Sequence, residues 1–561
     1  MDMFLQTERT DPDGIAVIDG GRDSHISVSR RELVRRIACL KRDLEARGID
    51  AGDCIALWLP NGSDIVVWQF AAFSLGAHVI GINTRYNVDE IANVLMRAQP
   101  KVLAIAYDFA GLDLLGRLRK WVAPPQVRIP TIAVVHGPGG RLPSEVEIAA
   151  HDLGGGSWNP RFRAAATLER LFDRGDPNGL AVAFTTSGST GLPKLAAHSD
   201  VGIATHAWAC IEAGDWRQGD VTLCALPLTG VFSFIPAMAT LMACGTCLME
   251  ARFDPDRIVV DMARFGVTHV IGADDIVGRI AESWRANPVA IGRWRRLLIA
   301  DFNGHSHELA AWAEDQFGVI ASGVYGSSEL LSLAALWPHT TPSPQRWTGG
   351  GRLVSPSYVA RCVEPETGAV CPPGDAGELQ FRGPNVVVDY LGQPELLERQ
   401  CTADGWFRSG DLGSVHADGS ISYRCRIGDA LRLKGFLVEP AEIESRLVEH
   451  PAVDIAKVVG VQLVGGATEA VAFVTARANA SITTDDLLAW CRDGLARFKV
   501  PRTIHVLDAM PTTTGTNGAK IRSAELRAWA ARFESNGERS WAAGDNSVAL
   551  GIHADKSGPG L

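Results

Sequence analysis

The sequence of 561 residues lacks an uninterrupted hydrophobic run of membrane length, an excess of basic charge and the pattern of a signal peptide at its start. Its longest apolar stretch, residues 65–82, contains Gln69, His78 and two glycines, so it predicts a buried helix followed by a strand. The formal net charge of −10 argues against a nucleic-acid partner, which needs a basic face. We therefore expect a cytoplasmic protein with no membrane span and no nucleic-acid partner.

The cysteines show no regular spacing. Eleven of them are scattered along the chain, which indicates a reducing compartment rather than a disulfide framework. Cys244 and Cys247 form a Cys-x-x-Cys pair inside an apolar run, where cysteine packs as a small hydrophobic residue. His305 and His307 have no third candidate ligand at a metal-binding spacing. We expect no metal site from these four residues.

The length and the order of the helix and strand signals predict a multidomain α/β protein. At 561 residues the chain exceeds the size at which one hydrophobic core keeps growing, so at least two domains are expected. Ser29 and Glu32 form a capping box at the start of one helix, and strand-like and helix-like segments then alternate as far as Ile82. This alternation predicts a parallel sheet with helices on both faces. Residues 531–561 are predicted to form a disordered tail.

A loop rich in glycine and hydroxyl groups follows the strand-like run at residues 180–185. Its glycines let backbone N–H groups approach an anion, its hydroxyl groups add donors and its lysine adds positive charge, so it predicts a phosphate-binding site. It differs from a Walker loop because Pro193 precedes the lysine and Leu195 follows it. Considered alone, the segment fits a flexible surface loop equally well. The predicted phosphate-binding residues are Thr186, Ser187, Gly188, Ser189, Thr190, Gly191 and Lys194.

Five further motifs follow this loop. They are YGSSE at 325–329, GELQFRG at 377–383, GWFRSGD at 405–411, RIGD at 426–429 leading to Lys434-Gly435, and NGAKI at 517–521. In this order, the six motifs make the chain resemble the adenylate-forming superfamily of acyl-CoA synthetases, nonribosomal peptide adenylation domains and luciferases. The resemblance covers about residues 1–530. It implies a large N-terminal domain of mixed sheets with flanking helices at 1–428, and a small mobile C-terminal α/β domain at 429–530.

The same resemblance assigns roles in ATP binding. In this superfamily a carboxylate attacks the α-phosphorus of ATP and pyrophosphate leaves, so catalysis is mostly positioning and electrostatics. The resemblance implies that Glu329 holds Mg²⁺ and that the loop beginning at Thr186 grips the β- and γ-phosphates. It also implies that Tyr325 lies on the adenine and that Asp411 and Arg426 hold the ribose. The other implied nucleotide-site residues are Asn303, Gly304, Gly326, Ser327 and Ser328, the last at the α-phosphate.

Lys520 is the principal catalytic residue that the resemblance implies. A mobile ammonium neutralises charge as the bond between the carboxylate and the α-phosphate forms. Without its motif, Lys520 would be read as a solvent lysine near the C-terminus. Asp429 matches the hinge before the small domain, and Lys434 and Gly435 match positions that line the tunnel for the pantetheine of CoA.

The predicted substrate pocket departs from the usual pattern of the superfamily. Phe302 replaces a glycine that usually opens the acyl tunnel, and Gly230 replaces an aromatic residue or histidine. Asp301 and Phe232 complete the predicted pocket. We expect an ATP-dependent, AMP-forming ligase that uses Mg²⁺ and CoA to activate a compact carboxylic acid. Two alternatives stay open: a nitrogen acceptor, as in amide-forming ligases and in diazotases that activate nitrite, or an inactive nucleotide-binding module.

Overall fold

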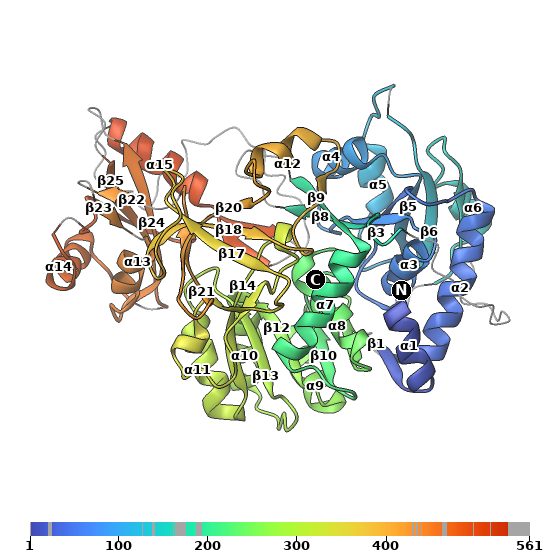
Figure 1. Cartoon of the computed structure of the whole chain (residues 1–561), viewed down its shortest axis with the longest axis horizontal. Coiled ribbons are helices and arrows are strands. Elements are labelled where there is room, and N and C mark those ends of the chain that lie inside the picture. The colour runs from blue at the N-terminus through green and yellow to red at the C-terminus, as the bar shows by residue number, and fades with distance from the viewer. Residues whose placement is uncertain are drawn as a thin grey trace. The chain divides into compact units, whose positions relative to one another are not determined.

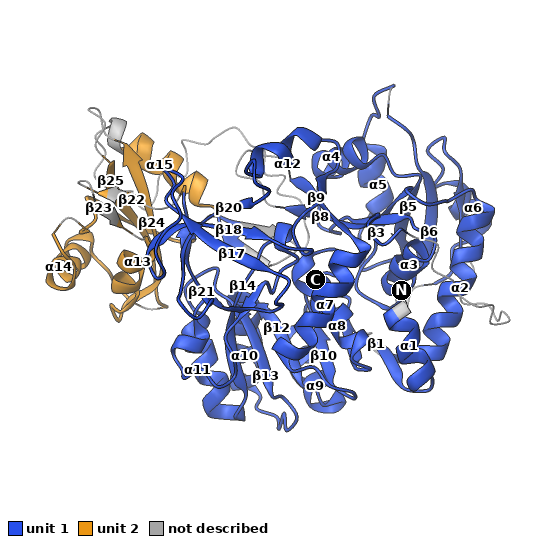
Figure 2. Ribbon diagram, viewed as in Figure 1, with its two compact units in different colours: residues 1–427, 512–521 blue, residues 428–511, 522–561 orange. Residues whose placement is uncertain are grey.

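The computed structural model describes residues 2–20, 25–125, 127–136, 141–160, 162, 176–186, 193–428, 431–433, 436–438, 440–462, 468–478, 480–497, 499–515 and 518–536. The described residues form two compact units, which Figure 2 colours separately. Unit 1 comprises Met1–Ile427 and Thr512–Ile521, and unit 2 comprises Gly428–Pro511 and Arg522–Leu561. The domain boundaries expected at 428 and 530 stay predictions, and the units differ from them by assigning Thr512–Ile521 to unit 1.

A large mixed sheet of unit 1 has the strand order β17-β18-β20-β21-β16-β15-β14-β13-β12-β10-β11-β1-β2. Its centre, from β14 to β1, is parallel, and the strands on either side are antiparallel. The strands are β1 (Ile15–Gly20), β2 (Ile26–Ser29), β10 (Val221–Cys224), β11 (Thr246–Glu250), β12 (His269–Ala273), β13 (Arg296–Ala300), β14 (Ile320–Tyr325), β15 (Ala335–Leu336), β16 (Gly350–Leu353), β17 (Val359–Val363), β18 (Ala376–Arg382), β20 (Phe407–Val415) and β21 (Ile421–Arg426).

A second sheet of unit 1 has the order β19-β9-β8-β4-β3-β5-β6-β7. It is parallel from β8 to β7 and antiparallel at β9 and β19. The strands are β3 (Cys54–Trp58), β4 (His78–Gly81), β5 (Val102–Tyr107), β6 (Thr131–His136), β7 (Ser157–Trp158), β8 (Leu180–Thr186), β9 (Lys194–Ser199) and β19 (Asp389–Tyr390). The predicted phosphate loop therefore joins two antiparallel neighbours, β8 and β9, in this sheet.

Helices of unit 1 cover these sheets. They are α1 (Asp2–Thr10), α2 (Arg30–Ala46), α3 (Ser63–Phe73), α4 (Val88–Ala98), α5 (Leu114–Arg119), α6 (Glu145–Ala149), α7 (Asp200–Gly214), α8 (Val231–Met242), α9 (Pro255–Phe265), α10 (Asp274–Ala286), α11 (Ser306–Phe317) and α12 (Pro394–Gln400), with short 3₁₀ turns η1 (Ser328–Leu330) and η2 (Gln345–Trp347). Helix α7 packs on β8 and β9, α8 packs on β10, β11 and β12, and the two helices contact each other, forming a layer between the sheets (Figure 1).

Local sequence signals explain the start of several elements. The hydroxyl of Ser29 accepts a hydrogen bond from the backbone N–H of Glu32 (3.3 Å), which caps α2. The other half of the predicted capping box does not form, because the carboxylate of Glu32 binds Arg35 and Arg36. The apolar stretch 65–82 forms most of α3 and then β4, and α3 is buried along its whole length. No helix within the described residues is long and apolar enough to cross a bilayer.

Unit 2 is a smaller α/β unit. Its sheet has the order β23-β22-β25-β24, with β26 also paired to β25. The strands are β22 (Leu431–Leu433), β23 (Phe436–Val438), β24 (Val453–Gln462), β25 (Thr468–Ala476) and β26 (Thr503–Leu507), and the helices are α13 (Pro440–Val448), α14 (Thr484–Gly494) and α15 (Ser523–Asn536). Helix α15 continues beyond residue 530, where the tail was predicted to begin, because Leu526 and Ala530 are buried and anchor it. Mixed sheets with flanking helices and a smaller α/β unit confirm the predicted fold class.

The hairpin of β27 (Thr512–Gly515) and β28 (Gly518–Ile521) belongs to unit 1. Strand β28 packs against α10, which begins where β12 ends. This packing brings a segment from near the end of the chain to the carboxyl edge of the parallel strands.

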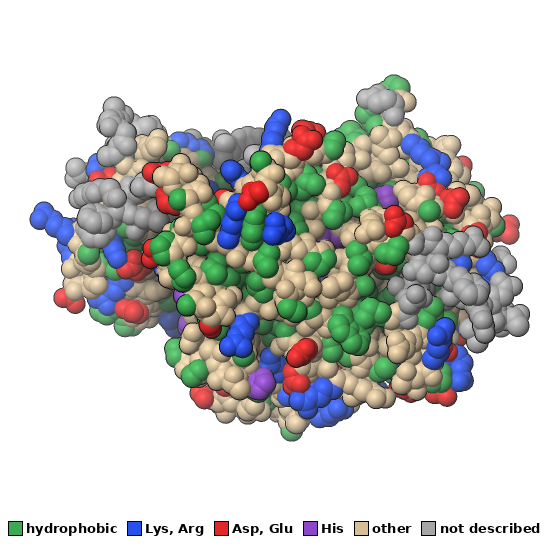
Figure 3. All heavy atoms as spheres, in the orientation of Figure 1, with side chains coloured by type: hydrophobic (Ala, Val, Ile, Leu, Met, Phe, Trp, Pro, Cys, Tyr) green, Lys and Arg blue, Asp and Glu red, His purple; other side chains and the backbone are tan. Residues whose placement is uncertain are grey.

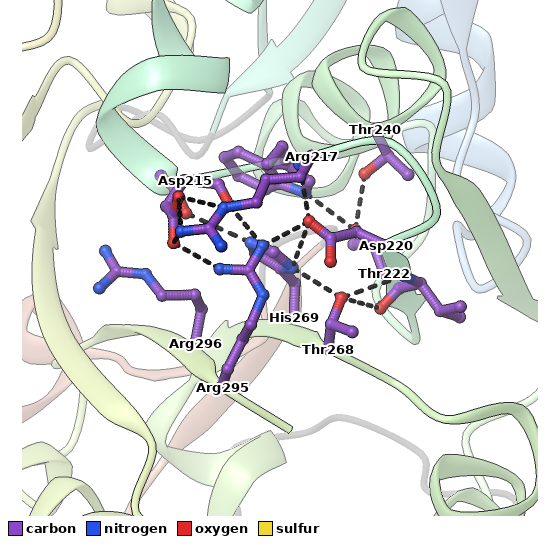
Figure 4. Close-up of polar contacts among 12 residues, drawn as sticks. Asp215, Arg217, Asp220, Thr222, Thr240, Thr268, His269, Arg295 and Arg296 are labelled. Carbon is purple, nitrogen blue, oxygen red and sulfur yellow. Dashed lines mark hydrogen bonds and ion pairs between the residues drawn. The ribbon is translucent and has the colours of Figure 1, made fainter. Parts of the chain in front are cut away.

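A buried polar network lies at the opposite edge, where β10, β12 and β13 begin (Figure 4). The guanidinium of Arg295 binds the carboxylates of both Asp215 and Asp220. The ring of His269 stacks on Trp216 with 4.9 Å between centroids, and burial lowers the pKa of His269 to about 4. The histidine is therefore neutral at pH 7. Arg296, labelled beside these residues in Figure 4, is buried, and its Nε and Nη1 have no hydrogen-bond partner among the described residues; burial lowers its pKa to about 10. On the face drawn in Figure 3, basic and acidic side chains are interspersed.

Candidate active site

Asp411 and Arg426 face each other across two neighbouring strands. They are in register on β20 and β21, and Nε of Arg426 lies 3.1 Å from Oδ1 of Asp411. The hydroxyl of Tyr325, at the end of β14, donates a hydrogen bond to Oδ2 of Asp411 (2.7 Å). Asp411 is only 4% exposed, and its burial raises the pKa of the carboxyl while Arg426 opposes that rise. The structure thus brings together three of the residues predicted to bind the nucleoside.

The ring of Tyr325 has aromatic neighbours on this sheet. It stacks on Phe381 with 5.6 Å between centroids and also contacts Tyr423 at 5.6 Å. Tyr325 is only 4% exposed, so its packing fixes the direction of the hydroxyl toward Asp411. Phe381 belongs to the GELQFRG motif, for which the sequence offered no role.

The loop that carries Ser328 and Glu329 is held by two buried histidines. Nε2 of His198 on β9 donates to the backbone carbonyl of Ser328 (2.8 Å), and Nε2 of His206 on α7 donates to that of Ser332 (3.0 Å). Burial lowers the pKa of His198 to about 3 and that of His206 to about 4, so both are neutral donors at pH 7. No sequence motif identifies these two histidines.

The same loop contains a run of left-handed backbone. Leu331, Ser332 and Leu333 have φ values of 58°, 52° and 31°, an uncommon conformation for residues other than glycine. Such strain persists only where surrounding contacts determine it, and it concentrates at functional sites. The hydroxyl of Ser332 donates to the carbonyl of Val231 (3.3 Å), which places the start of α8, with Gly230 and the buried Phe232, beside this turn.

Tyr390 lies between Lys194, at the end of the predicted phosphate loop, and Glu329. Its hydroxyl lies 3.5 Å from Oε1 of Glu329, and Nζ of Lys194 lies 5.7 Å from the centroid of its ring. Thr186 and Lys194 are paired in register where β8 ends and β9 begins. The predicted residues Ser187, Gly188, Ser189, Thr190, Gly191, Asp429, Lys434 and Gly435 lie outside the described residues.

Lys520 on β28 shares an electrostatic environment with the residues above. Burial, and after it the positive charge of Arg426, lower the pKa of the Lys520 ammonium to about 8, while Glu329 and Asp411 act to raise it. Nζ of Lys520 lies 4.1 Å from the centroid of the Phe302 ring. Residues separated by about two hundred positions in the sequence thus meet within unit 1.

Asp274 holds the loop that carries Phe302 and Asn303. Its carboxylate accepts hydrogen bonds from the backbone N–H groups of Phe302 (3.3 Å), Asn303 (2.8 Å) and His305 (3.2 Å). It also accepts one from the side-chain amide of Asn303 (3.0 Å). Burial, reinforced by the charge of Asp301, raises the pKa of Asp274 to about 6. Nothing in the sequence identified Asp274.

The outer part of this loop is more open. Asp301 is exposed and its Oδ1 accepts a hydrogen bond from the N–H of Gly304 (2.9 Å). Gly304 has φ of +90°, a conformation that favours glycine. Gly326 and Ser327, which join β14 to η1, complete the predicted nucleotide-site residues that the structure describes.

Comparison with known proteins gives the same family along most of the chain. A family model described as "AMP-binding enzyme" matches residues 4–391, and one described as "AMP-binding enzyme C-terminal domain" matches residues 442–516. Feruloyl-CoA synthase of an Amycolatopsis species is 28% identical over 93% of this chain and 97% of that protein. A 3-[(3aS,4S,7aS)-7a-methyl-1,5-dioxo-octahydro-1H-inden-4-yl]propanoyl:CoA ligase from Rhodococcus jostii is 27% identical over 87% of this chain and 92% of that protein. The crystal structure of ATP-bound MatB from Rhodopseudomonas palustris is 26% identical, has a TM-score of 0.79, and covers 95% of this chain and 99% of its own.

Proposed function

Because the chain belongs to the AMP-binding enzyme family, we propose that it activates a compact carboxylic acid as an acyl-adenylate and transfers the acyl group to CoA. Membership confirms the predicted superfamily and the prediction of an ATP-dependent, AMP-forming ligase. The observation that carries the proposal is the cluster in which Asp411 binds Arg426 (3.1 Å) and Tyr325 (2.7 Å), with the ammonium of Lys520 close enough to be influenced by the charges of Asp411, Arg426 and Glu329. A cation beside groups that suit ribose and Mg²⁺ is what adenylyl transfer needs.

The first half-reaction is carried by positioned charges. Asp411 accepts hydrogen bonds from the ribose hydroxyls. Arg426 opposes the rise in the pKa of this carboxyl that burial causes. The ammonium of Lys520 lies between the substrate carboxylate and the α-phosphate, where it neutralises negative charge in the transition state. Its pKa of about 8 leaves most of the side chain protonated at pH 7.

Glu329 fits a role in holding Mg²⁺. The Glu329 residue is half-buried. Among the described residues its carboxylate accepts a long hydrogen bond from the hydroxyl of Tyr390 (3.5 Å), which leaves oxygen lone pairs for a hard cation. The cation would offset charge on the phosphate oxygens when bound. Thr186 and Lys194 flank the loop that is proposed to hold the β- and γ-phosphates, and Ser328 is proposed to contact the α-phosphate.

The names of two relatives support CoA as the acceptor, and together with the predicted pocket they support an acid that contains a ring. Both relatives named above are CoA ligases, one for ferulate and one for a fused-ring propanoate, and both names describe acids that contain rings. Phe302 is half-buried, so part of its aromatic surface is accessible to a ring of the acid. Phe232 is buried and stays part of the proposed pocket. Asp429 as a hinge, and Lys434 and Gly435 beside the pantetheine, stay part of the proposal.

The test is pyrophosphate release by the full-length protein over a panel of acids. We expect release with ring-containing acids such as ferulate, and an acyl-CoA product only when CoA is added. The control is Lys520→Ala, which should release pyrophosphate more slowly by a factor of about 10² to 10³. Two outcomes would instead support the alternative with a nitrogen acceptor. One is pyrophosphate release that requires nitrite, and the other is an amide formed from an added amine when added CoA gives no acyl-CoA. ATP binding without pyrophosphate release for any substrate would contradict the proposal and support the inactive module.

A further inference from the structure

The proposed catalytic lysine lies against an aromatic face. Nζ of Lys520 is 4.1 Å from the ring centroid of Phe302, well inside the range of about 6 Å for a cation–π interaction. Both residues belong to unit 1. The sequence predicts Phe302 only as a wall of the acyl tunnel, so this contact points to a second role for the residue.

The electrostatics of Lys520 explain why a ring is useful there. Burial and Arg426 both disfavour the ammonium, and Glu329 and Asp411 favour it. If a carboxylate held Lys520 in a direct salt bridge, that pair would have to break before the ammonium could reach the α-phosphate. The negative face of a ring attracts a cation without a directional bond, so it holds the ammonium and still lets it move to a stronger negative charge.

The ring itself is fixed by Asp274. This residue is 1% exposed at the first position of α10, and its carboxylate binds the N–H groups of Phe302, Asn303 and His305. Three backbone bonds to one buried carboxylate leave the loop little freedom. Helix α10 also packs against β28, which carries Lys520, so one helix supports both partners of the contact.

We propose that Phe302 is a positioning residue for Lys520, and that Asp274 sets the ring in place by binding its loop. This inference rests on the proposed function, because it assumes that Lys520 acts in adenylation. It assigns to Phe302 an effect on the rate of the first half-reaction, in addition to any effect on the size of the acid.

The first test compares Phe302→Leu with Phe302→Tyr in pyrophosphate release. Leucine keeps apolar volume and removes the ring, whereas tyrosine keeps the ring. We expect kcat to fall about tenfold in Phe302→Leu, with the KM for ATP unchanged, and to stay near the wild-type value in Phe302→Tyr. The matched control is Phe253→Leu, because Phe253 is also half-buried and contacts the cation of Arg279, at 4.4 Å, elsewhere in unit 1. A wild-type kcat in Phe302→Leu would overturn the proposal.

A second test needs no activity. The ligand-free protein is labelled with trace acetic anhydride, and acetylation of Lys520 is measured by peptide mass spectrometry relative to Lys101. Loss of the ring removes both the shielding and the stabilisation of the ammonium, so Lys520 should be acetylated severalfold faster in Phe302→Leu than in the wild type. In Phe302→Tyr and Phe253→Leu the acetylation rate of Lys520 should equal that of the wild type. If the wild-type protein releases no pyrophosphate with any acid, the proposed function fails and this labelling still decides the contact. Equal labelling rates in all variants would overturn it.

Asp274→Asn tests the support of the ring. Asparagine has one carbonyl oxygen in place of two carboxylate oxygens, so part of the bonding to the loop is lost. We expect a lower kcat and faster labelling of Lys520, and the double variant with Phe302→Leu should be no worse than the more affected single variant. Additive losses would show that Asp274 acts elsewhere and would overturn its assigned role.

Discussion

At the amino ends of β12 and β13 the shifted pKa values leave His269 neutral and Arg296 charged at pH 7, whereas at the carboxyl ends of the same strands the shifts bring a carboxyl and an ammonium toward neutral pH. Arg295 binds Asp215 and Asp220 at the first edge. At the other edge, burial raises the pKa of Asp274 to about 6 and lowers that of Lys520 to about 8. Ligands of open α/β sheets bind at the carboxyl edge, and groups with perturbed pKa values concentrate at functional sites. The difference teaches that one edge of the sheet holds groups whose protonation is fixed near pH 7, whereas the other holds two groups that titrate close to it.

The largest effect that this comparison predicts is for Lys520→Ala. Removing the ammonium should lower pyrophosphate release by a factor of about 10² to 10³, the loss typical of one group that stabilises transition-state charge. ATP binding and the melting temperature should stay close to those of the wild type. The measurement is initial-rate pyrophosphate release together with calorimetric titration of ATP. Lys499→Ala, which removes a lysine paired with Glu442 in unit 2, is the control, and normal release by Lys520→Ala would reject the assignment.

The opposite edge should respond in stability rather than in rate. Arg295→Met leaves Asp220 buried beside a neutral histidine, which should lower the free energy of unfolding by about 2–3 kcal/mol. Breaking a fully buried ion pair costs about 3–5 kcal/mol. The loss expected here is smaller because the Arg295 side chain is 28% exposed. The midpoint of urea denaturation measures this loss, and Arg293→Met, at an exposed neighbour, is the control. Below the unfolding range, kcat/KM should be unchanged; a loss of rate without a loss of stability would break the comparison.

The fold and the polar site differ in how far the sequence predicts them. Segments such as α3 and β4 have local apolar patterns from which the helix and the strand can be predicted. The ordered motifs identify Tyr325, Asp411 and Lys520 as site residues from their residue types and their spacing. His198 and Asp274 could not be found in this way. Their partners are backbone groups about 130 and 30 positions away, and a bond to a backbone group leaves no trace in the identity of the partner residue. Which strand edge they reach is decided only when the sheet forms.

The pH dependence of adenylation should follow the carboxyl edge. The proposal requires Lys520 to act as the ammonium. Its pKa is lowered to about 8, so the charged form is lost as the pH rises through 8. We expect the rate to fall about tenfold for each pH unit above that value. Initial rates from pH 6.5 to 9.5 at saturating ATP measure this limb. The arginine of Lys520→Arg stays charged across this pH range, so the rate of that variant, even if low, should not fall above pH 8. A wild-type rate that is constant up to pH 9.5 would contradict the assignment.

The smallest expected effect concerns the choice of acid and is measured as a ratio. If the Phe302 ring closes the acyl tunnel, Phe302→Gly should raise kcat/KM for a straight-chain acid of eight to ten carbons relative to that for ferulate by about tenfold, the range in which pocket contacts discriminate. The loss of the contact with Lys520 should slow both acids alike, so it cancels in the ratio and leaves the effect of the pocket alone. If the ring instead packs in the core, its removal leaves a cavity that costs about 3–5 kcal/mol, and the melting temperature falls sharply while the ratio stays unchanged. Residues other than Phe302 would then determine which acids the enzyme accepts, and the structure would no longer support a preference for a compact acid.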